Sequence, residues 1–135
     1  MLNSDVAAAV LLETIVRATY TSREPGALLP MQWSILRFLA RVPEEQRSAK
    51  MITKFLGIPA APTSRAVQGL VKRKLVKQEK SLEDARSFRL VLLPDAKKAL
   101  EQDPLLQIAK SVANLPDEEK QLFKKSLETI VMDIH

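Results

Sequence analysis

The stretch "ITKFLGIPAAPTSRAVQGLVKRKLV", residues 52–76, gives the strongest indication of the fold of this chain. Its segment "GIPAA", at 57–61, carries a glycine and a proline, which end one helix and open a turn. A short helix is expected before this turn, over about 48–56. Ser48 is well placed to act as its N-cap, and Gly57 is well placed to act as a left-handed C-cap.

A longer helix is predicted after the turn, over about 61–73. Pro62 fits its first turn, where the N–H that proline lacks is not needed. Apolar residues recur at helical spacing and predict a buried stripe of Ala66, Val67, Leu70 and Val71. The residues expected on the outer face are Thr63, Ser64, Arg65, Gln68, Lys72 and Arg73.

Two runs with the composition of strands come next, "LVKQEK" at 75–80 and "SFRLVLL" at 87–93. The loop 81–86 separates them, and runs at this distance predict a β-hairpin. A short helix, a tight turn, a longer polar-faced helix and a hairpin, in this order, are typical of a winged helix–turn–helix.

Helical patterns flank this region on both sides. Further helices are expected over about 3–19, 30–41 and 117–134. Helical sequence also resumes at Pro94, and the pair Asp103-Pro104 should kink or split it.

The composition argues against an enzyme or a metalloprotein. The chain has no cysteine, and its single histidine is the last residue, His135. Thiolate and imidazole chemistry are therefore not expected. The acidic pairs Glu44-Glu45 and Glu118-Glu119 are adjacent, so their side chains diverge on a helix and cannot readily share a substrate. We predict no catalytic residue, no metal and no cofactor.

Length and hydropathy indicate one soluble domain. The 135 residues are 46% hydrophobic and 27% charged, which is ordinary for a globular protein. No signal-peptide pattern and no apolar run long enough to span a bilayer is found. We expect a cytoplasmic protein without a membrane partner.

Positive charge is concentrated in the middle of the chain. Residues 46–92 contain eleven Lys or Arg and three acidic residues, whereas the remainder contains ten basic and thirteen acidic residues. A basic centre between mildly acidic ends indicates a module that binds a polyanion such as DNA. The alternative is a solvated lysine-rich surface.

The segments "LLPMQWSILRFL" (28–39), 52–76 and "DARSFRLVLL" (84–93) together resemble the MarR (multiple antibiotic resistance regulator) family of bacterial transcription factors. The resemblance runs over about residues 28–97. Its most specific element is Asp84-x-Arg86 at the right distance after "KRKLV". The chain departs from the family at three positions: Lys74 replaces a glycine, and Pro94 and Lys97 replace a threonine and a glycine.

The resemblance implies a mainly α (α+β) fold, a winged helix–turn–helix with a helical dimerisation domain built from both chain ends. One domain, 1–135, would contain the winged part at 30–93 and the dimerisation part at 1–29 with 94–135. The partners implied are double-stranded DNA and a second copy of the chain. The dimerisation residues expected from the terminal apolar stripes are Val10, Leu11, Leu127, Ile130 and Val131.

The wing is assigned from the hairpin. A guanidinium on a thin loop can enter the narrow, negative minor groove, and a neighbouring carboxylate can hold it in one rotamer. The resemblance gives these roles to Arg86 and Asp84, and Arg89 joins them on the second strand. The alternative is an incidental surface ion pair.

The longer helix would enter the major groove. Thr63, Ser64 and Arg65 lie in its first turns, and Gln68 lies one turn further on. Hydroxyl groups suit phosphates, and arginine can pair with guanine. Helix capping by Ser64 and a solvated Arg65 are the alternatives. Contacts to the DNA backbone are expected from Lys50, Lys54, Lys72, Arg73 and Lys77.

The resemblance also implies a small aromatic or phenolic effector, bound between the two parts of the protein. Trp33, Leu36 and Phe38 are the candidates for its pocket, and core packing is the alternative. We therefore predict a homodimeric DNA-binding regulator, a repressor, that reads a pseudo-palindromic site. The rival from another class is a winged-helix protein-interaction module that does not bind DNA.

Overall fold

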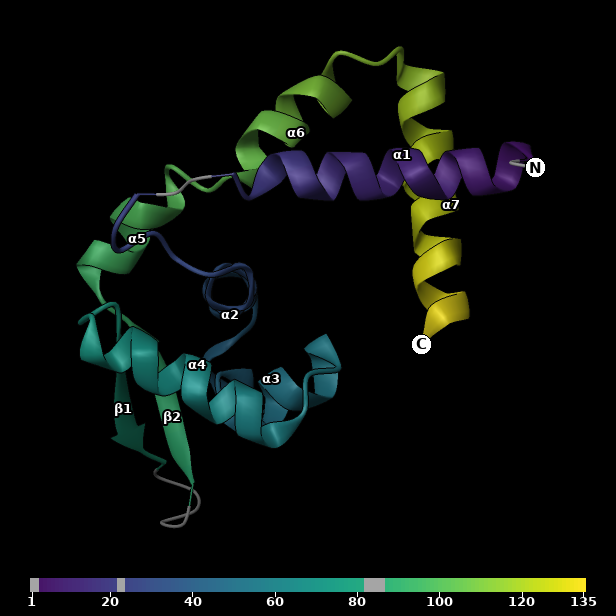
Figure 1. Cartoon of the computed structure of the whole chain (residues 1–135). Helices are drawn as coiled ribbons and strands as arrows, with labels where there is room; N and C mark the ends of the chain where they lie inside the picture. The colour runs from purple at the N-terminus through teal and green to yellow at the C-terminus, as the bar shows by residue number, and fades with distance from the viewer. Residues whose placement is uncertain (1–2, 22–23, 82–86) are drawn as a thin grey trace. The chain divides into compact units, whose positions relative to one another are not determined.

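The computed structural model describes residues 3–21, 24–81 and 87–135. It divides into two compact units, 26–103 and the combined ends 1–25 with 104–135. The central unit contains four α-helices, a 3₁₀ turn and a two-stranded sheet among its described residues (Figure 1). Its elements are α2 (Pro30–Arg41), η1 (Glu44–Gln46), α3 (Ala49–Leu56), α4 (Ala60–Lys72), β1 (Val76–Lys80), β2 (Phe88–Leu92) and α5 (Pro94–Leu100). The expected winged helix–turn–helix is confirmed.

The caps predicted for α3 are present. The hydroxyl of Ser48 accepts the Met51 N–H at 3.2 Å. Gly57 has a left-handed φ of 66°, and its N–H donates to the Thr53 carbonyl at 3.1 Å. Both ends of this short helix are therefore closed by local hydrogen bonds, which leaves its orientation to packing.

Lys74 closes α4 although it is not a glycine. Its φ is 60°, the one positive value found for a non-glycine among the described residues. The Leu75 N–H donates to the Leu70 carbonyl and the Lys74 N–H to the Val71 carbonyl, both at 3.0 Å. This bonding pattern is a Schellman motif, so lysine occupies the left-handed position that glycine normally holds.

The two strands form an antiparallel hairpin in which Val76 pairs with Leu92 and Glu79 pairs with Arg89. Beyond the pairing, the Leu90 N–H donates to the carbonyl of Arg47 at 2.7 Å. The second strand is thereby attached to the segment that leads into α3.

The core of the central unit brings together side chains from every element except η1. Ile35, Leu36 and Leu39 of α2 are fully buried, and they pack with buried residues of α3, α4, both strands and α5. The other buried apolar residues are Phe38, Ile52, Val67, Leu70, Leu75, Val76, Leu90 and Ala96. Because Ala96 lies in this core, α5 belongs with the winged part, whereas the sequence assigned all of 94–135 to the dimerisation part.

The terminal unit consists of α1 (Ser4–Thr19), α6 (Leu105–Ala113) and α7 (Asp117–Ile134). The break at Asp103-Pro104 is confirmed, since α5 ends at Leu100 and α6 begins at Leu105. None of the three terminal helices has a buried residue. Their apolar stripes are therefore largely open in a single chain.

Candidate nucleic-acid interface

The outer face of α4 carries four polar side chains in a row. Ser64, Arg65, Gln68 and Lys72 are all exposed, while Val67 and Leu70 on the opposite side are buried. Spacings of three and four residues place these polar groups on one side of the helix. This row presents a hydroxyl, an amide and two cations to an incoming partner.

Thr63 does not belong to this face. It is only 1% exposed, and its hydroxyl donates to the Pro59 carbonyl at 2.9 Å. The hydroxyl of Thr53 on α3 lies 3.5 Å away. Thr63 precedes Val67 by one turn, so the helical period carries it into the core. Its expected contact with DNA is wrong, and it joins the two helices instead.

The N-terminus of α4 has no side-chain cap. The N-cap residue is Pro59, and no side-chain hydrogen bond closes this end. Ser64 therefore does not cap the helix, which was the alternative to a role on the surface. The first N–H groups of α4 keep the partial positive charge that suits an anion.

The two residues expected at the wing tip, Asp84 and Arg86, lie outside the described residues. Arg89 is described, and its guanidinium lies between two carboxylates. Its Nη1 is 3.4 Å from Glu44 Oε2, and its Nη2 is 3.4 Å from Glu79 Oε2. Arg89 thus makes intramolecular ion pairs, which the sequence did not indicate.

Glu79 also binds a second cation. Its Oε1 lies 2.9 Å from Lys77 Nζ. The hydrogen bonds from Lys77 and then Arg89 lower the pKa of the Glu79 carboxyl below its ordinary value. Glu79 therefore remains ionised between Lys77 and Arg89.

The expected backbone contacts are all on the surface. Lys50, Lys54, Lys72, Arg73 and Lys77 are exposed. Three of these residues have contacts within the chain, and one of the three is Lys77, which pairs with Glu79. Lys54 Nζ lies 5.7 Å from the Phe55 ring centre, and Arg73 donates to the Gly26 carbonyl.

The proposed effector residues have different surroundings. Leu36 and Phe38 are core residues, and Leu36 is 0% exposed, so the expectation that it lines an open pocket is wrong. Leu36 lies on the side of α2 that faces the core, and α2 packs against α4. Trp33 is half-buried and stacks with Arg37, whose Cζ is 5.9 Å from the ring centre.

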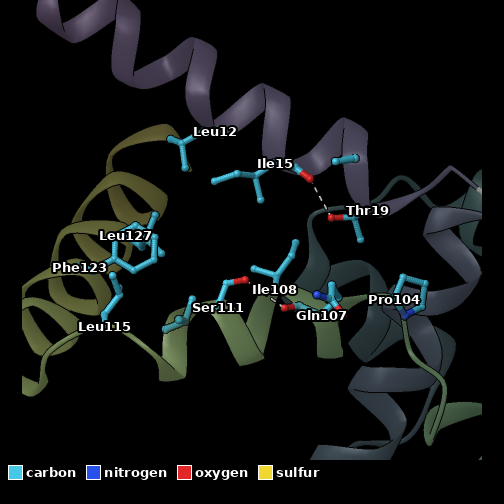
Figure 2. A pocket seen from close by; sticks show the side chains of 12 residues that line it. Leu12, Ile15, Thr19, Pro104, Gln107, Ile108, Ser111, Leu115, Phe123 and Leu127 are labelled. Atoms are coloured by element: carbon cyan, nitrogen blue, oxygen red, sulfur yellow. Dashed lines mark hydrogen bonds between the residues drawn. The ribbon is translucent and has the colours of Figure 1, made fainter.

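An apolar groove of about 820 Å³ is found within the terminal unit (Figure 2). Side chains of α1, α6 and α7 point into it, including Ile15, Ile108 and Leu127. The remaining lining residues are Leu12, Ala18, Thr19, Pro104, Gln107, Ser111, Val112, Leu115 and Phe123. Outside this groove, Val10, Leu11, Ile130 and Val131 are also exposed.

The described part of the chain offers no group of three or more His, Cys, Asp or Glu side chains arranged to hold a metal ion. Within the same residues, no helix combines the length and the apolar character needed to cross a membrane.

Three positioning contacts were missed at the sequence level. Glu44 and Glu79 hold Arg89, and the Glu79–Arg89 contact could have been found from the hairpin register. Gln32 approaches α4 at Gly69, where an added Cβ would lie 2.8 Å from its Nε2. The absence of a side chain at Gly69 thus leaves room for the Gln32 amide behind the polar face.

The central unit is therefore a winged helix–turn–helix, and α4, the second helix of the motif, has a basic outer face. Proteins of this class bind DNA through that helix. The MarR family model matches residues 28–87. The matched residues cover most of the winged helix–turn–helix, and they include the segments whose motifs resemble this family.

Solved structures show the same fold along the whole chain. MepR of S. aureus in its complex with DNA is 16% identical, with a TM-score of 0.78 and 100% of both chains covered. A MarR transcriptional regulator from Methanosarcina mazei Go1 is 24% identical, with a TM-score of 0.72 and 93% and 94% covered. MepR bound to ethidium bromide is 16% identical, with a TM-score of 0.60 and 99% and 98% covered. No curated protein matches the sequence significantly. These structures show the fold, and the family model over residues 28–87 supports a DNA-binding transcriptional regulator.

Proposed function

We propose that this protein is a sequence-specific transcriptional repressor that binds a pseudo-palindromic operator as a homodimer. The observation that carries the proposal is the exposed row Ser64, Arg65, Gln68 and Lys72 on the second helix of a winged helix–turn–helix. In this fold the second helix enters the major groove with its N-terminal residues against base edges.

Each side chain of the row has a chemistry that suits a defined part of DNA. Arg65 can donate two hydrogen bonds to the O6 and N7 of guanine, and Gln68 can pair with adenine. Ser64 and the uncapped N-terminus of α4 suit phosphate oxygens. The surrounding lysines Lys50, Lys54, Lys72 and Lys77, together with Arg73, would add affinity without reading sequence.

The wing would add a minor-groove contact. We assign this contact to Arg86, with Asp84 holding its guanidinium in position, on the strength of the family motif and the basic hairpin. Arg89 is not proposed as a DNA contact, since Glu44 and Glu79 already engage its guanidinium.

Dimerisation through the chain ends would cover the open apolar surface. Leu127 faces a wide apolar groove, and Ile130 and Val131 are about half exposed further along α7. Apolar surface this extensive favours association. A two-fold dimer would set two α4 helices about 34 Å apart, one turn of DNA, which fits a pseudo-palindrome.

A small aromatic effector would release the operator by favouring a dimer with the wrong helix spacing. MepR has been observed with ethidium bromide, and Trp33 offers a half-buried ring in the present chain. Release requires a higher affinity for the non-binding conformation than for the DNA-binding one.

Selection from random DNA duplexes tests the proposed function. The full-length protein should enrich two inverted half-sites whose centres lie about one helical turn, roughly 10 base pairs, apart. The Arg65→Ala variant should enrich a less specific motif. Failure of the wild type to enrich any motif would contradict sequence-specific binding and favour the protein-interaction module.

A further inference from the structure

Arg89 is held by two carboxylates near the loop end of the hairpin. It lies on β2 directly opposite Glu79 on β1, and their side chains share one face of the hairpin. The side chain of Arg89 is 36% exposed, and its Nε is buried without a hydrogen-bond partner among the described residues. The guanidinium is therefore drawn back against the protein rather than extended into solvent.

The second carboxylate comes from outside the hairpin. Glu44 lies in η1, between α2 and α3, and its Oε2 is 3.4 Å from Arg89 Nη1. The adjacent residue Leu90 donates its N–H to the Arg47 carbonyl, also in the segment before α3. A side-chain contact and a backbone contact thus attach the same part of β2 to the same segment.

Taken without their contacts, the negative charges of Glu44 and Glu79 are unfavourable for DNA binding. Glu79 adds negative charge to the hairpin and Glu44 adds it beside the hairpin, whose other described ionised residues are Lys77, Lys80 and Arg89. Removing a negative charge near a polyanion should strengthen its binding. The two carboxylates need a different explanation, and their contacts with Arg89 supply one.

We propose that Glu44, Glu79 and Arg89 are positioning residues, which fix the loop end of the hairpin against the segment preceding α3 so that the wing tip meets the minor groove while α4 occupies the major groove. This inference rests on the proposed DNA-binding function. It assigns Arg89 a role through its carboxylate partners, instead of the direct phosphate contact that its charge suggests.

Glu45 provides a matched control. It is the neighbour of Glu44 in η1, it is exposed, and no ion pair is found for it among the described residues. Glu45→Gln removes the same charge from nearly the same place. A general electrostatic effect would therefore change DNA affinity equally in Glu44→Gln and Glu45→Gln, whereas positioning would separate them.

The test measures DNA affinity by anisotropy, on the duplex selected by the wild type, for Glu44→Gln, Glu45→Gln, Arg89→Gln and the double variant Glu44→Gln/Arg89→Gln. Glu44→Gln and Arg89→Gln should each weaken binding about three- to fivefold, and the double variant should be no weaker than Arg89→Gln. Glu45→Gln should bind at least as tightly as the wild type. Binding by Glu44→Gln that equals or exceeds that of the wild type would overturn the proposal. So would a decrease of about one in the slope of log affinity against log salt concentration in Arg89→Gln alone, because that decrease marks a lost phosphate contact.

Hydrogen exchange in the free protein separates this inference from the proposed function. The Leu90 amide should exchange faster in Glu44→Gln than in Glu45→Gln, because the attachment of β2 is weakened. Unchanged exchange would overturn the proposal. If the wild type selected no DNA, the proposed function would fail, and the exchange rates would still decide whether the attachment exists.

Discussion

The guanidinium of Arg37 on α2 donates two hydrogen bonds to the carboxylate of Asp103, with Nε–Oδ2 and Nη2–Oδ1 distances of 2.7 Å. Their side chains are only 12% and 10% exposed. Asp103 stands at the end of the central unit, immediately before Pro104. This bidentate ion pair links the segment after α5 to α2.

Removing Asp103 should destabilise the central unit strongly. Asp103→Ala leaves the charge of Arg37 nearly buried without this carboxylate, and breaking such a pair costs about 3 kcal/mol or more. Glu13–Arg17 is the control, since its charged atoms are also 2.7 Å apart but 68% and 78% of the side chains is exposed. Glu13→Ala should cost less than about 0.5 kcal/mol. Urea denaturation gives both values, and equal losses would contradict the account.

Replacing Lys74 with glycine should stabilise the protein by about 0.5–1 kcal/mol. A lysine with φ of 60° pays a steric cost that glycine avoids. Lys74→Ala is the control, because it removes the same side chain but keeps the Cβ. The denaturation midpoint of Lys74→Gly should exceed that of Lys74→Ala, and the reverse order would contradict the left-handed conformation.

The contribution of Glu79 to stability should depend on pH in one direction. Hydrogen bonds from Lys77 and Arg89 lower its pKa in the folded protein below the ordinary value of 4.5. The ionised carboxylate therefore stabilises the fold above about pH 4.5, and this stabilisation is lost as the pH falls through the lowered pKa. Denaturation of the wild type and Glu79→Gln should differ near pH 7 and converge as the pH falls below the lowered pKa. A difference that persisted unchanged at low pH would contradict this assignment.

A charge in the apolar stripe of α7 should dissociate the proposed dimer. Ile130 is 44% exposed in the single chain, so Ile130→Glu should leave the helix folded while preventing its burial against a partner. Lys125→Glu, on a different side of α7, also introduces a carboxylate and should leave the dimer intact. Analytical ultracentrifugation distinguishes the two results. A dimeric Ile130→Glu variant at micromolar concentration would exclude this stripe from the interface.

Local signals made much of the fold predictable from the sequence. Ser48 and Gly57 mark the ends of α3, and Pro30 and the Asp103-Pro104 pair mark helix boundaries, because each acts through its own backbone geometry. The order of the elements then defined the winged helix–turn–helix. The basic row on α4 followed from helical periodicity, apart from Thr63.

The failures concern contacts between elements. Thr63 is polar but lies at a core position, where the Pro59 carbonyl satisfies its hydroxyl, so polarity alone misplaced it. Arg89 was assigned to DNA from its charge in the basic hairpin, and its contact with Glu44, which lies 45 residues away, was missed because no local pattern indicates it. The roles of Asp84 and Arg86 stay predictions, since both lie outside the described residues.

The most direct test of the central claim is a fluorescence anisotropy titration of the wild type with DNA from upstream of its own gene, in excess competitor DNA and across a salt series. Arg65→Ala and Arg86→Ala are measured beside it. We predict competitor-resistant binding by the wild type that weakens with salt, and a loss of about 1–3 kcal/mol, roughly five- to 150-fold in affinity, in each variant. Equal, weak and competitor-sensitive binding by all three proteins, on this DNA and on selected duplexes, would contradict a sequence-reading winged helix.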